Sequence, residues 1–84
     1  MSDISGSYYF KFNSNKLATD IKNYRDEFSL TNKEMCRVLG VTEEIFSKIL
    51  RTKLIPDVLL LNQICIVLDR LPGGRNIYSY IKEL

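Results

Sequence analysis

Gly40 is the residue that most constrains how this chain can fold. It lies within RVLGVTEEIF (residues 37–46), where one helical apolar pattern stops and another starts a few residues later. Glycine often ends a helix because it adopts the left-handed conformation without steric cost. Thr42 follows at the position of a helix N-cap. The stretch therefore predicts two short helices joined by a tight turn, with Gly40 at positive φ.

The helix before Gly40 has a start signal of its own. Thr31 and Glu34 form a T-x-x-E capping box, in which the side chain of each residue accepts a hydrogen bond from the backbone amide of the other. Leu30 and Met35 occupy the two positions of a hydrophobic staple across that cap. We expect a helix over 32–39, with Met35, Cys36 and Leu39 buried.

The helix after Gly40 is expected over 43–51 and has one apolar and one polar side. At about 100° per residue, Phe46, Ile49 and Leu50 face inward. The outward side carries Glu44, Ser47, Lys48 and Arg51. The pattern predicts an amphipathic surface helix whose outer side is open to solvent or to a partner.

Two further helices complete the predicted helical domain, 15–70. The first is expected over 15–28, because apolar residues recur there at helical spacing. These residues are Leu17, Ile21, Tyr24 and Phe28. Pro56 and Asp57 open the other, over 58–69, with Asp57 as its N-cap. Its apolar stripe consists of Leu60, Leu61, Ile64, Cys65 and Leu68.

Both ends of the chain are rich in aromatic residues. Residues 1–14 form an N-terminal arm, in which the alternation of Tyr8, Phe10 and Phe12 is typical of a short strand. An isolated strand is unstable, so this one has to pack on the body or on another chain. The C-terminal extension, 71–84, has helical spacing at Ile77, Tyr80, Ile81 and Leu84. A short helix capped by Asn76 is favoured there, with a strand as the alternative because short apolar runs fit both.

The composition bounds the classes of function. With 84 residues, 45% of them apolar, the chain builds one core and has no room for a cofactor cleft. It contains no histidine, and Cys36 and Cys65 lack C-x-x-C spacing, so we expect no metal site and no cofactor. Without a histidine base or a glycine-rich phosphate loop, an enzyme is not expected. The cysteines are expected to be buried thiols of a reducing cytosol.

Nothing in the sequence predicts a membrane partner. The beginning, MSDISGSYYF, lacks the order of a signal peptide. The longest apolar stretch, VLLLNQICIVL, is too short to span a bilayer. We therefore expect a cytoplasmic protein. Its net charge of +2 does not by itself favour any class of partner.

Residues 17–68 resemble the lambda-repressor-like (Cro and repressor-type) helix-turn-helix family. The resemblance rests on features that occur in order: Arg25, Leu30-Thr31, Glu34, the LGVT turn, the run FSKI, Pro56 and a leucine-rich last helix. It implies an all-α fold, a compact bundle of four or five helices with a short extended N-terminal arm. It also implies a sequence-specific regulator of transcription that binds double-stranded DNA, such as a repressor of phage or mobile-element type.

The resemblance also implies roles for individual residues. The helix over 43–51 would lie in the major groove, and the helix over 32–39 would lie across it. The side chains facing the bases would be Thr42, Glu43, Glu44, Ser47, Lys48 and Arg51. Those near phosphates would be Thr31, Asn32, Lys33 and Lys53.

Three positions depart from the pattern of the family. Asn32 replaces a usual glutamine, and Thr52 replaces a common glycine. Leu50 replaces a frequent acidic residue, so Arg25 is expected to lack its usual partner and to point to solvent or phosphate.

Glu43 and Glu44 are the most unusual feature, because DNA is a polyanion. One interpretation is that they only start the helix, at the positive end of its macrodipole. A second is that a glutamate accepts a hydrogen bond from a cytosine amino group in the groove. A third is that the same scaffold is a protein-binding module, such as an antirepressor or an inhibitor of a host factor. DNA binding is the favoured interpretation.

Regulators of this size usually bind DNA as dimers. The termini are the expected source of the dimer surface, with packing on the same chain as the alternative. The candidate dimer contacts are Tyr8, Phe10, Ile77, Tyr80, Ile81 and Leu84.

Overall fold

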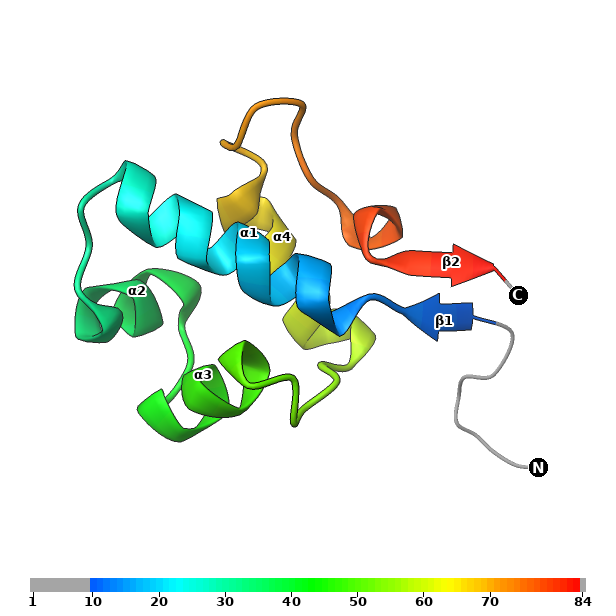
Figure 1. Cartoon of the computed structure of the whole chain (residues 1–84), viewed down its shortest axis with the longest axis horizontal. Helices are drawn as coiled ribbons and strands as arrows, with labels where there is room; N and C mark the ends of the chain where they lie inside the picture. Colours follow the sequence, from blue (N-terminus) through cyan, green and yellow to red (C-terminus); the bar gives the residue numbers. More distant parts are fainter. Residues whose placement is uncertain (1–9, 84) are drawn as a thin grey trace.

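The structure, a computed structural model, describes residues 10–83 and is mostly helical (Figure 1). Its helices are α1 (Ser14–Glu27), α2 (Asn32–Leu39), α3 (Glu43–Leu50) and α4 (Val58–Leu68), followed by the 3-10 helix η1 (Ile77–Ser79). Two three-residue strands, β1 (Phe10–Phe12) and β2 (Ile81–Glu83), form the sheet. The predicted all-α class is confirmed at this level. Within residues 10–83, no helix is long and apolar enough to cross a membrane.

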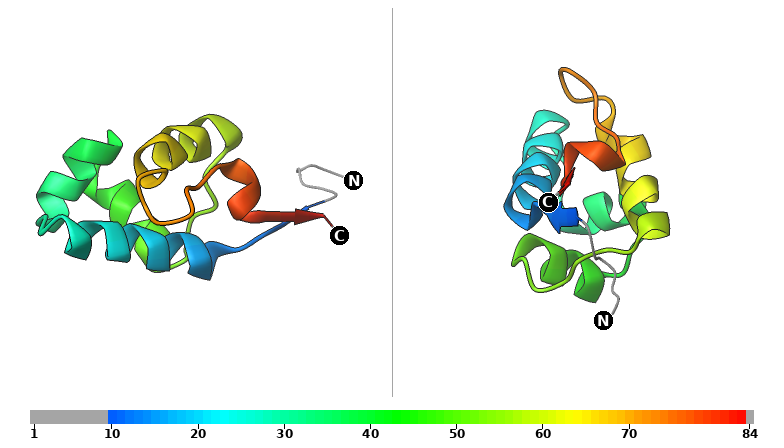
Figure 2. Two further views of the ribbon diagram at one scale, coloured as in Figure 1. Left: turned by 90° about the horizontal axis from the view of Figure 1, so that it is seen from above. Right: turned by 90° about the vertical axis from the view of Figure 1, so that its right-hand side faces the viewer.

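Each of α1 and α2 packs against both α3 and α4. Figure 2 shows α1 and α4 on opposite sides of the molecule, with α3 at the edge between them. This arrangement leaves the outer side of α3 facing away from the core.

The helix starts follow the predicted caps. Thr42 Oγ1 accepts a hydrogen bond from Ile45 N at 3.1 Å, and Asp57 Oδ1 accepts one from Leu60 N at 2.8 Å. α2 has the predicted bounds, and α3 ends one residue early, with Arg51 as its C-cap. These caps satisfy backbone amides that the helix itself leaves without partners.

One core joins all the helices. It contains the apolar residues of α1 at helical spacing, Leu17, Ile21 and Tyr24. It also contains the predicted inward residues of α2, α3 and α4, namely Met35, Cys36, Leu39, Phe46, Ile49, Leu61, Ile64, Cys65 and Leu68, together with Leu71 and Tyr80. Leu50 and Leu60 are only partly buried against it. Phe28, the last apolar residue at helical spacing, is exposed because α1 ends before it, and its ring lies beside that of Tyr24. Burial raises the pKa of the Cys65 thiol to about 11 and raises that of Cys36, so both thiols stay protonated.

The C-terminal extension contains both predicted alternatives, a short helical turn and a strand, and the turn is much shorter than predicted. Asn76 does act as a cap, because its Oδ1 accepts a hydrogen bond from Tyr78 N at 2.8 Å, but only the three residues of η1 follow. The chain then becomes β2, which pairs antiparallel with β1, with Phe12 opposite Ile81. Asn13 N continues the pairing by donating to Tyr80 O at 2.7 Å. The N-terminal arm thus supplies the strand partner that a short apolar run needs.

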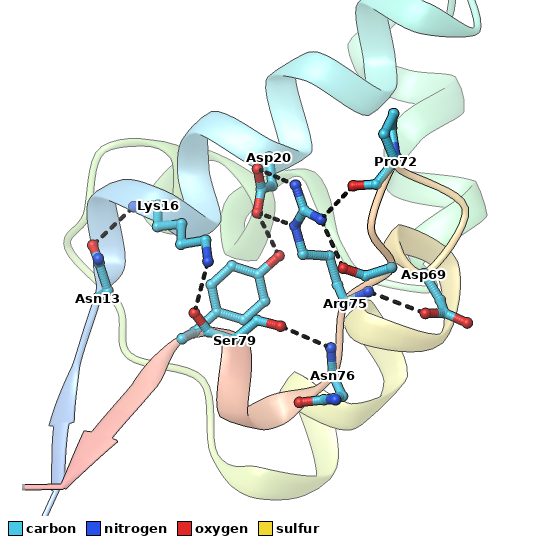
Figure 3. A network of polar contacts seen from close by, with 10 residues as sticks. Asn13, Lys16, Asp20, Asp69, Pro72, Arg75, Asn76 and Ser79 are labelled. Atoms are coloured by element: carbon cyan, nitrogen blue, oxygen red, sulfur yellow. Dashed lines mark hydrogen bonds and ion pairs between the residues drawn. The ribbon is translucent and has the colours of Figure 1, made fainter.

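Tyr80 is held in the core by a polar network (Figure 3). Its hydroxyl donates to Asp20 Oδ2 at 2.7 Å, and Arg75 Nε donates to the same oxygen at 2.8 Å. Burial would raise the pKa of Asp20, but the hydrogen bonds from Arg75 and Tyr80 and the charge of Arg75 together lower it. Asp20 is therefore a buried carboxylate that keeps its charge.

The same network corrects the expected dimer contacts. Tyr80 is 1% exposed and cannot meet another chain. Ile77 and Ile81 are partly buried against the core of their own chain. Tyr8, Leu84 and the side chain of Phe10 lie outside the described part of the chain. The C-terminal extension therefore packs on its own domain.

Candidate functional site

The candidate site is built on α2, α3 and the turn between them. Gly40 ends α2 in the left-handed conformation, with φ 72° and ψ 34°, as predicted. The amide of Gln63 on α4 donates to Leu39 O and to Gly40 O. The turn is therefore held against α4 by a side chain that the sequence analysis did not single out. The only signal for Gln63 was that it interrupts the apolar run of α4.

The first turn of α2 is organised by the predicted capping box. Glu34 N donates to Thr31 Oγ1 at 3.1 Å, and Thr31 N donates to Glu34 Oε1 at 2.8 Å. The pKa of Glu34 is lowered mainly by the hydrogen bond from the backbone amide of Thr31 and further by a hydrogen bond with the Thr31 side chain. The backbone amide of Thr31 is thus already used, and its exposed hydroxyl is the group left to reach a ligand.

The outer side of α3 is mixed in charge. Glu43, Glu44 and Arg51 are exposed, and Ser47 and Lys48 are half-buried. Lys48 Nζ lies 3.2 Å from Glu44 Oε2, an i,i+4 pair whose side chains are 44% and 77% exposed. An exposed pair of this kind adds little stability, on the order of 0.3–0.5 kcal/mol. Its consequence is electrostatic, because part of the Glu44 charge is neutralised on the helix itself.

A shallow pocket of about 290 Å³ lies between α2 and α3. Its polar lining is Asn32, Glu43, Ser47 and Arg51, and its apolar lining is Cys36, Phe46 and Leu50. The pocket brings together four of the predicted site residues. Thr31, Lys33, Thr42, Glu44, Lys48 and Lys53 lie outside its lining.

Arg25 has a different role from the expected one. Its Nη1 donates to Asn32 Oδ1 at 2.8 Å, and its Nε lies 3.2 Å from Asp26 Oδ1. Instead of pointing to solvent, Arg25 links the end of α1 to the first residue of α2. Because the oxygen of the Asn32 amide accepts this hydrogen bond, its NH2 group is the part left to donate to a ligand.

The predicted phosphate contacts Lys33 and Lys53 are both exposed. Lys33 lies in the first turn of α2, and Lys53 lies just beyond α3. Lys53 N donates to Lys48 O at 2.8 Å, which turns the chain away from the end of α3. The two lysines thus come from separate segments, one in α2 and the other beyond α3.

Thr52, beside this site, has φ 57°, a left-handed conformation that is costly for a β-branched residue. We expect Thr52→Gly to raise the free energy of unfolding by about 0.5–1 kcal/mol. It relieves about 1–2 kcal/mol of backbone strain, partly offset by the entropy of glycine in the unfolded chain. Urea denaturation followed by circular dichroism measures the effect.

The matched control for Thr52→Gly is Ser29→Gly, at φ 54° after α1. Serine is not β-branched, so its replacement should stabilise the domain less. A lower stability of Thr52→Gly would mean that the 2.6 Å bond from Thr52 Oγ1 to Arg51 O outweighs the strain.

Comparison of this chain with protein-family models, with curated proteins and with solved structures found no match.

Proposed function

We propose that this chain is a lambda-repressor-like helix-turn-helix regulator that binds double-stranded DNA, with α3 in the major groove. The observation that carries the proposal is the geometry of α2, Gly40 and α3. Two eight-residue helices meet through a left-handed glycine, and the outer side of the second helix is polar and accessible. An α-helix with its side chains is about 10–12 Å in diameter, and the major groove is about 12 Å wide, so α3 fits into it.

The phosphate contacts of the proposed complex come from both ends of the helix pair. The Asn32 NH2 group and the Thr31 hydroxyl are donors at the start of α2, and Lys33 and Lys53 supply positive charge on either side. Donors and cations of these kinds make most protein contacts to the DNA backbone. Their spread over two segments suits a duplex lying across α2 and along α3.

The two glutamates are compatible with a DNA-facing helix. Both lie in the first turn of α3, where the macrodipole favours negative charge. Glu44 is also paired with Lys48. We infer that Glu44 is a helix starter that restrains Lys48, and that Lys48 and Arg51 carry the attraction to DNA.

The test is fluorescence anisotropy of labelled duplexes, random and genomic, over a series of salt concentrations. Lys48→Ala and Arg51→Ala should weaken binding, and each should flatten the slope of log K against log salt by about one unit. The matched control is Lys11→Ala, an exposed lysine of β1, the strand that Figure 1 shows at the end of the molecule away from α2 and α3. It should leave both affinity and slope unchanged.

Glu44→Gln separates the interpretations of that residue. It should raise affinity for all duplexes without changing preference, because it removes a repulsive charge and releases Lys48. A loss of preference at one base pair, of about 1–3 kcal/mol, would instead assign Glu44 to cytosine. Failure of the wild type to bind any duplex at low salt would overturn the proposal in favour of a protein-binding module.

A further inference from the structure

The hydrogen bond between Arg25 and Asn32 fixes the direction of the Asn32 amide. Arg25 Nη1 donates to Asn32 Oδ1 at 2.8 Å. A guanidinium group has donors and no acceptor, so only the oxygen of the amide can face it. The NH2 group therefore lies on the side of the amide away from Arg25. Without such a partner, an asparagine amide takes either of two directions, because its terminal torsion is broad and roughly two-fold.

The guanidinium group of Arg25 is itself held in place. Its Nε lies 3.2 Å from Asp26 Oδ1, and the Arg25 side chain is only 24% exposed. The backbone of Arg25 is fixed as well, because Leu30 N donates to Arg25 O at 2.8 Å across the connection between α1 and α2. The positive charge also polarises the amide that it binds, which makes the NH2 group a stronger donor. Arg25 thus gives both direction and strength to a donor on another helix.

The Asn32 NH2 group is accessible to a ligand. Asn32 is the exposed first residue of α2, and it lines the pocket between α2 and α3 together with Ser47 and Arg51. Within residues 10–83, the only hydrogen bond of the Asn32 side chain is the one that its oxygen accepts. Neutral amide donors of this kind make many of the contacts between proteins and DNA phosphates.

We propose that Arg25 is a positioning residue of the DNA interface, which directs the Asn32 NH2 group to a backbone phosphate and does not itself contact DNA. The inference rests on the proposed function, because it states how one phosphate contact of that complex is made. The competing arrangement is a direct contact between Arg25 and a phosphate. The two arrangements differ measurably, because an indirect role requires Asn32 and releases no counterion of its own.

A double-mutant cycle tests the proposal by fluorescence anisotropy of the tightest-binding labelled duplex over a series of salt concentrations. Arg25→Met keeps most of the stem and removes the donors. It should weaken binding about 3–10-fold, which is the cost of ordering one side chain on association. In the Asn32→Ala background the same change should matter less than about 2-fold. In both backgrounds the slope of log K against log salt should change by well under one unit, since no phosphate contact of a charged group is lost.

Arg25→Gln is a second variant without the cation. It should have the same effect as Arg25→Met, because a glutamine amide can face either end of the Asn32 amide. The matched control is Lys22→Met, which removes an exposed cation from the same helix about one turn before Arg25. Its effect on affinity should be the same with Asn32 as with Asn32→Ala. Circular dichroism and urea unfolding verify that each variant is folded.

A spectroscopic measurement without DNA tests the positioning directly. In ¹⁵N relaxation by NMR, the side-chain NH2 group of Asn32 should be ordered in the wild type and mobile on the ps–ns timescale in Arg25→Met. Lys22→Met should leave it ordered. A side chain that only stabilised the fold would not change the motion of this group in a folded variant.

Three results would overturn the proposal. The first is an Arg25→Met variant that weakens binding equally in both backgrounds and flattens the salt slope by about one unit, which would assign Arg25 itself to a phosphate. The second is an unchanged affinity in Arg25→Met and Arg25→Gln. The third is an Asn32 NH2 group as mobile in the wild type as in Arg25→Met. In each case the proposed function stands if the wild type binds DNA, whereas a wild type that binds no duplex at low salt overturns both.

Discussion

Replacing Gly40 with valine should lower the free energy of unfolding by about 3 kcal/mol. Its φ of 72° costs an ordinary residue about 1–2 kcal/mol, and a β-branched residue more. A Cβ at this position would also lie 2.7 Å from Nε2 of Gln63. Gln63 would have to move, losing its bonds to Leu39 O and Gly40 O, for about 1 kcal/mol more. Small domains are stable by about 5–15 kcal/mol, so the loss is large.

Gly73 offers a matched control for the two parts of this cost. It also has positive φ, 87°, but a Cβ there would meet only Arg75 Nη1, at 3.9 Å. Gly73→Ala should therefore show the backbone cost alone, and Gly40→Ala should cost about 1 kcal/mol more. Urea denaturation measures both. Equal losses would mean that the Gln63 contact contributes nothing to the turn.

Arg75→Ala is expected to lower the free energy of unfolding by a comparable amount. It removes the cationic partner of Asp20, whose side chain is only 7% exposed. Breaking a buried ion pair from one side costs about 3–5 kcal/mol, because a charge is left buried without compensation. Since Tyr80 still donates to Asp20, we expect about 3 kcal/mol, measured by thermal and urea unfolding.

Two variants separate the charge from the packing. Tyr80→Phe keeps the ring and removes only one hydrogen bond to the carboxylate, so it should cost about 1.5–3 kcal/mol. The double variant Asp20→Ala/Arg75→Ala should cost less than the sum of its single changes, since it leaves no unpaired charge. If Arg75→Ala lowers the free energy of unfolding by no more than about 0.5 kcal/mol, the Asp20–Arg75 pair contributes no more than an exposed ion pair.

Acid should lower the free energy of unfolding of the wild type, because it protonates the Asp20 carboxylate. The pKa of Asp20 is lower in the folded protein, so its contribution is complete above its unfolded pKa of about 3.9. The contribution is lost as the pH falls through the lower, folded value. The acid part of the stability curve should therefore be shallower in Arg75→Ala than in the wild type. The exposed Arg51→Ala, whose arginine lies on α3, should keep the wild-type slope.

The helix starts of α2, α3 and α4 were predictable because capping is local. Thr31, Thr42 and Asp57 each accept a hydrogen bond from an amide three residues further on. The signal and its target therefore lie within one turn of chain. The outer side of α3 was predictable for a similar reason, since the helical period by itself separates apolar from polar residues.

The polar links of the candidate site were not predictable in the same way. Arg25 donates to a residue seven positions away in another helix, and Gln63 reaches the turn from 24 positions away along the chain. Whether such side chains meet depends on how the helices are packed. The sequence predicts that Asn32 lies at the start of α2, but only the folded chain brings Arg25 of α1 to its amide oxygen.

The C-terminal extension was decided by tertiary structure alone. The spacing of Ile77, Tyr80 and Ile81 favours a helix, but a strand also fits these residues because short apolar runs suit both. β1, at the other end of the chain, supplies the backbone partners for the strand. Asp20, 60 residues away in sequence, supplies the buried acceptor for the Tyr80 hydroxyl. Tyr80 is therefore a core residue because of groups that only the folded chain brings to it.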